Sequence, residues 1–290
     1  MTTTTLVAGA TGYLGRFVVA ELHRRGHKVR ALTRSRERAV SPGPWDSPSL
    51  DGLVDDWAIG EVTNPAFIAD VAVGIDDVIS TLGVTRQKAN PWDIDHRANL
   101  AILRSAETHG VTHFCFVNVI GGDQCPAQLT RAKTAFAHEL AASQISSQII
   151  NPPGYFSDMT QILQMARKGR VLLFRPDTRI NPIHGADLAT FCIDRLTDGK
   201  EGTWDVGGPE VFTWKGLAEC AFQALHRPVR VATMSPAILS PLIGALRLFN
   251  RRRADMLRFI SWNMLRDCVG EPFGTHGLLD FYKDLVAGRH

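Results

Sequence analysis

Three glycines near the start of the chain follow a spacing that suits phosphate binding. Gly9, Gly12 and Gly15 follow an apolar run at 6–8 and lead into an amphipathic stretch at 14–22. Gly9 permits a tight turn, Gly12 lets backbone N–H groups approach a pyrophosphate, and Gly15 lets the helix pack closely on the strand. The phosphates would lie at the helix N-terminus, where free N–H groups and the helix dipole favour negative charge. The spacing therefore predicts a dinucleotide-binding turn.

Arginines follow the second apolar strand of the chain. The strand at 28–33 ends without the Asp or Glu that usually binds the ribose 2′-hydroxyl of NAD. Arg34 follows it directly, and a guanidinium binds a 2′-phosphate with paired hydrogen bonds. We therefore predict NADP(H), with Arg34 on the 2′-phosphate and Arg16 reaching the same group from the first helix. Arg36 and Arg38 are interpreted as solvated surface.

Strands and helices alternate along the first half of the chain. The predicted strands are 4–8, 28–33, 56–60, 77–81, 112–118 and 147–151, and the predicted helices are 13–25, 65–73, 93–109 and 127–143. This alternation predicts an α/β fold with a doubly wound parallel sheet and helices on both faces. Ligands of such sheets bind at the carboxyl ends of the strands. One cofactor there would contact the glycine turn, Thr33 with Arg34, and the turn Thr81-Leu82-Gly83.

The pattern loosens after residue 151. Pro152-Pro153-Gly154 breaks the chain, and helices at 157–168 and 214–225 alternate with short strands near 180 and at 203–206. We expect two parts: a nucleotide-binding core at 1–151, and at 152–290 the remaining sheet elements interleaved with a helical substrate-binding region. The segment 34–51, rich in Pro, Ser and Arg, is expected to be a mobile loop.

The composition excludes several classes of protein. The 290 residues are 44% hydrophobic and 21% charged, and the net charge of +3 is too small to indicate nucleic-acid binding. The five cysteines lack metal-binding spacing and predict reduced thiols in a cytoplasmic protein without a metal. The first strand begins almost at once, which leaves no room for a signal peptide, and no apolar run reaches the ~18 residues of a membrane span.

Apolar residues are concentrated near the C-terminus. Two such stretches, at 238–249 and 256–265, flank Arg251-Arg252-Arg253. They predict either two amphipathic helices that form an apolar wall over a pocket or a surface that docks on a membrane, with the arginines meeting anionic lipid. Both interpretations favour a hydrophobic substrate.

An ordered set of motifs resembles the atypical short-chain dehydrogenase/reductases, in particular the NmrA-like group and its branch containing divinyl chlorophyllide 8-vinyl reductase. The matching segments are 9–19, 77–83, Trp92-Asp-Ile-Asp95 with Asn99, Arg131-Ala-Lys133, 180–187 and 206–210. The resemblance implies an extended Rossmann fold, NADP(H) and a small, mostly helical C-terminal substrate region.

The resemblance also implies roles for individual residues. The phosphates would be lined by Gly9, Thr11, Gly12, Tyr13, Leu14 and Gly15, and the 2′-phosphate by Arg34. Thr81, Leu82 and Gly83 would pass the adenine-side ribose and pyrophosphate. Lys133 would bind the nicotinamide ribose, and Pro152 through Phe156 would run past the nicotinamide.

The catalytic group departs from the family pattern. Typical members use Ser, Tyr and Lys, but Leu129 stands four residues before Lys133, and Asn118 stands at the serine position. Leucine donates no proton, and a positioned acid is worth roughly 10²–10⁴ in rate. Hydride addition to a conjugated double bond or a quinone creates a delocalised anion that needs an acid less. We therefore expect such a substrate, with Asn118 or a backbone N–H stabilising the oxyanion and Tyr155 as a candidate donor.

Several assignments stay open at this level. His184 and Asp187 are interpreted as structural, Asp187 as a group that satisfies first-turn N–H groups. Asp95 and Asn99, four residues apart, either brace the sheet or approach the pocket. The absent tyrosine also fits an alternative, an NADP-binding regulator without turnover. The oligomeric state and the substrate itself are left open.

Overall fold

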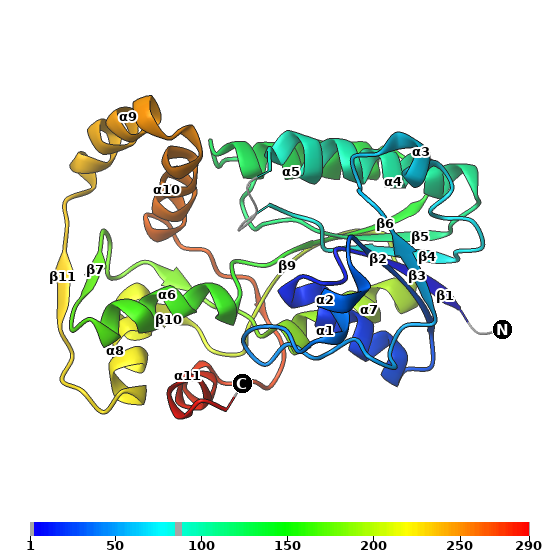
Figure 1. Ribbon diagram of the computed structural model, residues 1–290. Helices are drawn as coiled ribbons and strands as arrows, with labels where there is room; N and C mark the ends of the chain where they lie inside the picture. The colour runs from blue at the N-terminus through cyan, green and yellow to red at the C-terminus, as the bar shows by residue number, and fades with distance from the viewer. Residues whose placement is uncertain (1–2, 85–88, 290) are drawn as a thin grey trace. The chain divides into compact units, whose positions relative to one another are not determined.

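The computed structural model describes residues 3–84 and 89–289 (Figure 1). The chain divides into two compact units that interleave along the sequence. The first comprises residues 1–118, 132–151 and 185–204, and the second comprises 119–131, 152–184 and 205–290. Each is described separately below.

The first unit is built on a parallel sheet, which confirms the predicted fold class. Its strands are β1 (Thr4–Ala8), β2 (Lys28–Thr33), β3 (Asp56–Ile59), β4 (Asp77–Ser80), β5 (His113–Val117), β6 (Ser146–Asn151) and β9 (Gly202–Gly207). With β12 (Glu271–Pro272), which pairs with the end of β9, the order is β12-β9-β6-β5-β4-β1-β2-β3. Strand order reverses at β1, between β2 and β4, so the switch point lies at the glycine turn.

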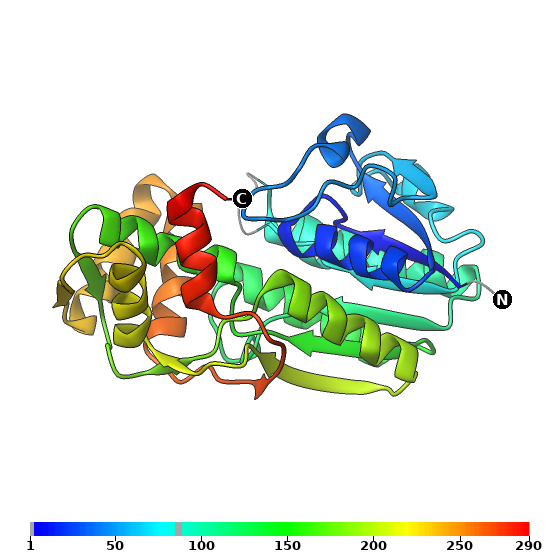
Figure 2. The ribbon, with the colours of Figure 1, turned by 90° about the horizontal axis from the view of Figure 1, so that it is seen from below.

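Helices cover both faces of this sheet (Figures 1 and 2). They are α1 (Tyr13–Arg24), α2 (Arg36–Val40), α3 (Pro65–Ala69), η1 (Trp92–Ala98), α4 (Asn99–Thr108), α5 (Gln128–Ala141) and α7 (Gly185–Asp198). Helices α1 and α7 pack together on one face, and α3 and α4 pack together on the other. The fully buried rings of Phe114, Phe116 and Phe136 lie in the core between β5 and α5.

The helix expected at 93–109 differs from the prediction. Its first part, η1, is a π-helix, and regular α-helix begins only at Asn99. The Asn99 amide donates to the carbonyls of Ile94 and Asp95, at 3.3 and 3.0 Å. Such side-chain bonds compete with the helical ladder, which gives a physical reason for the wider turn. The expected helix at 65–73 is shorter as well and ends at Ala69.

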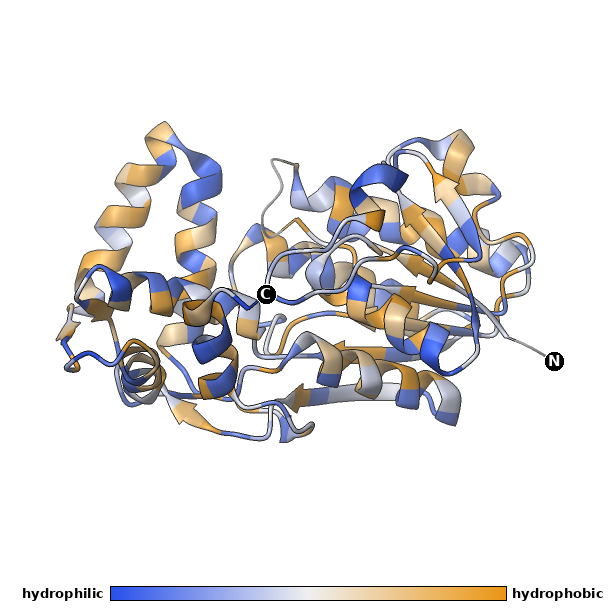
Figure 3. Ribbon diagram, turned by 60° about the horizontal axis from the view of Figure 1, so that its bottom comes forward, coloured by the Kyte–Doolittle hydropathy of each residue, from blue (hydrophilic) through white to orange (hydrophobic). Residues whose placement is uncertain are grey.

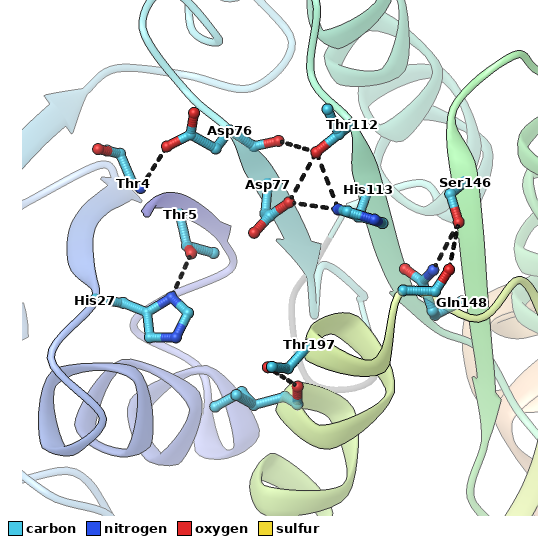
Figure 4. A network of polar contacts seen from close by, with 12 residues as sticks. Thr4, Thr5, His27, Asp76, Asp77, Thr112, His113, Ser146, Gln148 and Thr197 are labelled. Atoms are coloured by element: carbon cyan, nitrogen blue, oxygen red, sulfur yellow. Dashed lines mark hydrogen bonds and ion pairs between the residues drawn. The ribbon is translucent and has the colours of Figure 1, made fainter. Parts of the chain in front are cut away.

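Polar contacts join the N-terminal ends of strands β1, β4 and β5 (Figure 4). Asp76 accepts a hydrogen bond from the Thr4 backbone N–H at 2.7 Å, and Asp77 pairs with the His113 ring at 2.8 Å. Thr112 bonds the Asp76 carbonyl and the Asp77 carboxylate. These groups satisfy one another, so the amino edge has a structural role.

The second unit is mostly helical. Its elements are α6 (Phe156–Arg167), β7 (Val171–Leu173), β8 (Arg179–Ile180), β10 (Phe212–Thr213), α8 (Trp214–Ala224), β11 (Val231–Thr233), η2 (Pro236–Ile238), α9 (Leu239–Phe249), α10 (Arg251–Met264) and α11 (Leu278–Ala287). Helices α6, α8 and α11 pack on one another around the buried Tyr282, whose hydroxyl donates to the Met159 carbonyl at 2.8 Å. Helices α9 and α10 form a hairpin. Across residues 3–84 and 89–289, no helix is long and apolar enough to cross a membrane.

Candidate functional site

The glycine turn joins β1 to α1 with almost no spare space. Gly9 has a φ of +80°, and a Cβ there would lie 2.8 Å from the Thr81 hydroxyl. A Cβ on Gly15 would lie 2.2 Å from the Gly9 carbonyl oxygen. The amide of Gly12 donates to that same oxygen at 2.9 Å, and Gly12 caps α1 without a side chain. No side chain caps the N-terminus of α1, so the backbone N–H groups of its first turn are available to bind an anion.

A pocket opens at the carboxyl ends of the strands beside this turn. Its lining contains many of the predicted cofactor residues: Gly9, Thr11, Gly12, Thr33, Arg34, Thr81, Leu82 and Gly83. They come from the ends of β1, β2 and β4, which the topology places side by side. The Thr81 hydroxyl donates to the carbonyls of Ala8 and Gly9, at 3.1 and 3.2 Å, and so ties two of these strand ends together.

Four residues that were not predicted from the sequence line the same pocket. They are Leu32, Glu61, Val62 and Ile94. Glu61 and Val62 follow the carboxyl end of β3, so the rule that selected the other strand ends would have found them. Leu32 and Ile94 carry no local signal, because apolar side chains of this kind are common in any core.

A second hollow adjoins the pocket and is lined by arginines. Arg34 borders both, and Arg16 and Arg38 border the second together with Ser35. The exposed Arg38 was interpreted as solvated surface, but it borders this hollow. Arg36 instead places its guanidinium over the Trp57 ring, 5.6 Å from the centroid. The cation-lined hollow has the chemistry that a phosphate group requires.

Arg16 does not have the predicted role. It is 4% exposed, and its guanidinium donates to the carbonyls of Thr11, Arg38, Ala39, Ser41 and Pro48 at 2.7–3.3 Å. These bonds occupy most of its N–H groups, so Arg16 holds the segment 38–48 against α1 and leaves the phosphate to other groups. The expected loop also contains the short helix α2, capped by the Ser35 hydroxyl.

Tyr13 and Leu14, predicted to line the phosphates, lie in the first turn of α1. The Leu14 side chain is 4% exposed. The Tyr13 hydroxyl accepts a hydrogen bond from the Gly185 amide at 3.2 Å, and its ring packs edge-on against Phe17 and Trp45. Both side chains have packing roles, so a contact with phosphate at these positions would come from the backbone.

Lys133 is buried at the ends of β4 and β5. Its Nζ donates to the carbonyls of Leu82 and Val117, at 3.1 and 2.9 Å, and lies 3.5 Å from Asp95 Oδ1. The two carbonyls take two of its three N–H donors, and the contact with Asp95 is an ion pair, since Asp95 Oδ1 accepts no hydrogen bond from the described residues. Lys133 therefore joins two strand ends and η1 within the first unit, and its predicted contact with the nicotinamide ribose stays a prediction.

Asp95 is the acidic partner of this lysine and is fully buried. Desolvation raises the pKa of Asp95 to about 6, although the Lys133 charge opposes the shift. Burial likewise lowers the pKa of Lys133, against the effect of Asp95. Asp95 Oδ2 accepts the Val84 amide at 3.3 Å. Burial thus disfavours the charged form of both groups, and the attraction between their charges opposes it.

Two asparagines complete the carboxyl edge of the first unit. Asn99 is fully buried and accepts the Ser80 hydroxyl, so it braces β4 and η1, which answers the question the sequence left open. The backbone N–H of Asn118 donates to the Ile150 carbonyl at 2.8 Å. Its buried Oδ1 accepts no hydrogen bond from any residue of 3–84 or 89–289. An unsatisfied buried amide is uncommon and is compatible with a ligand-binding role.

The remaining predicted site residues belong to the second unit. The Pro152 carbonyl accepts the Ile120 amide, and Tyr155 precedes α6, where Asp158 accepts its backbone N–H at 3.2 Å. The Phe156 ring is 1% exposed and packs against His184 and Phe281. The contacts of Pro152, Tyr155 and Phe156 with the nicotinamide stay predictions. Leu129 is buried in α5.

His184 and Asp187 lie where α7 begins. The His184 ring is 2% exposed and stacks on His276 with 4.1 Å between centroids, which agrees with a packing role. Asp187 is buried in the first turn of the helix, which starts at Gly185. Within the described part of the chain, no cluster of His, Cys, Asp or Glu is arranged to hold a metal ion, and all five cysteines are free and buried.

The family model described as NAD(P)H-binding matches residues 9–199. The chain therefore belongs to the NAD(P)H-binding family, and its cofactor is a nicotinamide dinucleotide. The turn and the two hollows described above lie within the matched residues, and the bare helix terminus and the arginines fit this group.

Among proteins of known name, the chain is similar to the chloroplastic divinyl chlorophyllide a 8-vinyl-reductase of Zea mays. The two are 29% identical over 262 residues, which is 84% of this chain and 65% of the maize protein. The chain thus spans just under two thirds of the length of this relative.

Solved structures share the fold over almost the whole chain. The NADPH-dependent quinone oxidoreductase QOR2 of Escherichia coli, complexed with NADPH, has a TM-score of 0.76 at 18% identity, covering 97% of this chain and 99% of its own. The triphenylmethane reductase of Citrobacter sp. has a TM-score of 0.74 at 13% identity, covering 98% and 99%. At these identities the likeness establishes the extended fold of NAD(P)-dependent reductases.

Proposed function

We propose that this protein is an NADPH-dependent oxidoreductase that transfers hydride to an apolar conjugated or quinone-like small molecule. The observation that carries the proposal is the arrangement at the carboxyl edge of the first unit. A bare helix terminus faces a pocket there, and an arginine-lined hollow adjoins that pocket. The names of the maize, E. coli and Citrobacter proteins support the substrate class, because they specify a vinyl group of divinyl chlorophyllide a, quinones and triphenylmethane dyes.

NADPH fits the hollow better than NADH does. Arg34 and Arg38 border it, and the acidic residue typical of an NAD site is absent from the end of β2. Glu61 lines the first pocket but follows β3, not β2. Two guanidinium groups beside a 2′-phosphate would each form charge-assisted hydrogen bonds, whereas a 2′-hydroxyl would leave them without an anion.

The missing acid defines the chemistry. A bound NADPH supplies a hydride. In a conjugated acceptor the electron pair of the attacked double bond moves onto an oxygen or a π-system, and a proton from Tyr155 or from solvent completes the reduction. Leu129 donates no proton, so an alkoxide from a simple ketone would lack a partner. We assign the side-chain N–H of Asn118 to the developing oxyanion, because Asn118 directly follows β5 and an amide N–H is a donor for negative charge. Its unpartnered Oδ1 is an acceptor and would take a hydrogen bond from a donor of the ligand. Lys133 and Asp95 are assigned as positioning residues that hold the ends of β4 and β5.

The proposal is tested with stereospecifically deuterated NADPH and a panel of lipophilic quinones and enones. We expect deuterium in one reduced product and stoichiometric NADP⁺. Tight binding of NADPH with no deuterium in any product would exclude the reductase and favour the alternative, an NADP-binding regulator. Tyr155→Phe tests the remaining candidate donor, because unchanged turnover in this variant would remove Tyr155 from the mechanism.

The 2′-phosphate assignment has a matched control in the same segment. We expect Arg34→Ala to weaken NADPH binding by about 10- to 100-fold while leaving NADH binding nearly unchanged. Arg38→Ala should have a smaller effect in the same direction. Arg36→Ala removes the same charge, but the Arg36 guanidinium lies over the Trp57 ring. This variant should therefore change the affinity for NADPH and for NADH by no more than about twofold. Equal losses in Arg34→Ala and Arg36→Ala would indicate a general charge effect and refute the assignment.

A further inference from the structure

Helix α9 in the second unit exposes most of its apolar side chains. Leu248 and Phe249 at its end are 84% and 89% exposed, and Leu242 is 45% exposed. Leu239 is the one residue of α9 that is buried, at 6% exposed. Large apolar side chains this exposed are unusual when they lie next to one another, and a contiguous group marks an interaction surface.

These residues form one stripe along the helix. Ile238, Leu242, Ala245 and Phe249 are exposed and follow one another at intervals of four, three and four residues. At 100° per residue they lie on a single face, with Leu248 beside its end. The half-buried Ile243 and Leu246 lie on a different face, and α9 packs against α10. The residues of the exposed stripe are therefore not the ones that pack against α10.

A cluster of positive charge adjoins the stripe. Arg251, Arg252 and Arg253 are exposed in the first turn of α10, directly after Phe249 and Asn250. Arg247 adds a fourth exposed charge, and the segment 236–254 contains no Asp or Glu. Cations at the first turn of a helix are opposed by its dipole, so their position does not stabilise α10 itself. Figure 3 shows the hydrophobic colouring of α9 giving way to hydrophilic colouring at the turn into α10.

We propose that the α9–α10 hairpin docks on the surface of an anionic lipid bilayer. The stripe residues and Leu248 would enter the region between headgroups and acyl chains, and the four arginines would meet lipid phosphates. A helix of 11 residues is about 16 Å long, which suits a segment lying in the interface. The neighbouring Asp255 accepts the Gln128 backbone N–H and lies near Arg258, so the four exposed arginines leave a net positive rim. A positive rim complements an anionic bilayer, whereas protein interfaces usually mix both signs of charge. This surface shares no residue with the lining of the cofactor pocket, and the proposal does not depend on the proposed reductase activity.

Vesicle co-sedimentation of the full chain tests the proposal. We expect binding to vesicles of phosphatidylcholine with phosphatidylglycerol, weaker binding to phosphatidylcholine alone, and a loss of binding as salt is raised. The double variant Leu248→Ser, Phe249→Ser should lower the partition coefficient at least about tenfold. The triple variant with Arg251, Arg252 and Arg253 changed to Gln should lower it by about 100-fold on anionic vesicles at low salt and little on neutral ones.

The matched control changes apolar residues elsewhere in the same unit. Val211 and Val229 are 46% and 49% exposed and lie outside the hairpin, so Val211→Ser with Val229→Ser should leave vesicle binding unchanged. Unchanged melting temperatures of all variants exclude unfolding as a cause. Three results would overturn the proposal: no binding of the unaltered chain to anionic vesicles, equal loss in the control, or a dimer in sedimentation equilibrium that Phe249→Ser abolishes, which would assign the stripe to a second copy.

Discussion

The carboxyl edge of the first unit and the α9–α10 hairpin of the second use similar residues in opposite ways. At the edge, Arg16 and Lys133 are buried, and each bonds several carbonyls. In the hairpin, Arg251 to Arg253 are exposed. Apolar side chains differ in the same way, because Leu6 is fully buried in β1 whereas Phe249 is almost fully exposed.

The difference shows which charges hold the fold together. A buried cation that loses its partners leaves carbonyls or a carboxylate unsatisfied, so its removal should cost stability. An exposed cation is solvated in the folded and the unfolded chain and contributes little. The first region should therefore respond to substitution through unfolding, and the second only through what it binds.

Replacing Lys133 by Met should give the largest loss of stability. The buried Asp95 would lose its counter-charge, and breaking such a pair costs about 3–5 kcal/mol. Lys215→Met is the control, because this exposed lysine of α8 forms an i,i+4 pair with Glu219 and should cost under about 0.5 kcal/mol. Urea unfolding of both variants provides the measurement. Similar losses at the two positions would mean that burial of the Lys133 pair contributes no special stability.

Gly9→Ala should destabilise the first unit by about 3 kcal/mol, because it combines a positive φ with a collision at the Thr81 hydroxyl. Gly74 has a φ of +71° but no atom within 4 Å of the position of a Cβ. Gly74→Ala therefore measures only the cost of placing a side chain at positive φ, which should be about 1 kcal/mol of unfolding free energy. Chemical denaturation measures both, and NADPH affinity should fall only in Gly9→Ala. Equal effects would show that the turn tolerates a side chain.

The contrast between arginines can be measured directly. Arg16→Met should cost about 2–3 kcal/mol, since it leaves several carbonyls of the segment 38–48 without donors. The same change at the exposed Arg251 should stay within about 0.5 kcal/mol. Hydrogen exchange of residues 36–50 should rise in Arg16→Met alone. Unchanged exchange there would mean that other contacts hold this segment.

The raised pKa of Asp95 predicts a smaller, pH-dependent effect. The folded state binds this proton more tightly than the unfolded chain, because the pKa rises from 3.8 to about 6 on folding. The stabilisation is therefore complete below about pH 4 and is lost as pH rises through 6, by about 2–3 kcal/mol. Asp95→Asn should remove this slope, whatever constant offset it adds. Unfolding free energies of the unaltered chain and of Asp95→Asn are measured from pH 4.5 to 7.5. Parallel curves for the two would contradict the raised pKa of Asp95.

Much of the first unit was predictable because its signals are local. The spacing of Gly9, Gly12 and Gly15 and the apolar runs of the strands depend on residues close in sequence, and most predicted strand limits agree with the structure to within a residue. The carboxyl-edge rule then placed Thr33, Arg34 and Thr81 in one pocket, as the structure confirms. Glu61 carries the same signal, because it follows the carboxyl end of β3, although it was not among the predicted residues.

By itself, the sequence determined the parallel sheet, the turn at its switch point and the arginine that follows β2, since periodicity and glycine spacing are properties of short segments. Only the tertiary structure decided that Arg16 binds carbonyls, that Asp95 and Lys133 form a buried pair across 38 residues of chain, and that the stripe on α9 is exposed. The physical reason is that burial and partners at long sequence separation are set by packing.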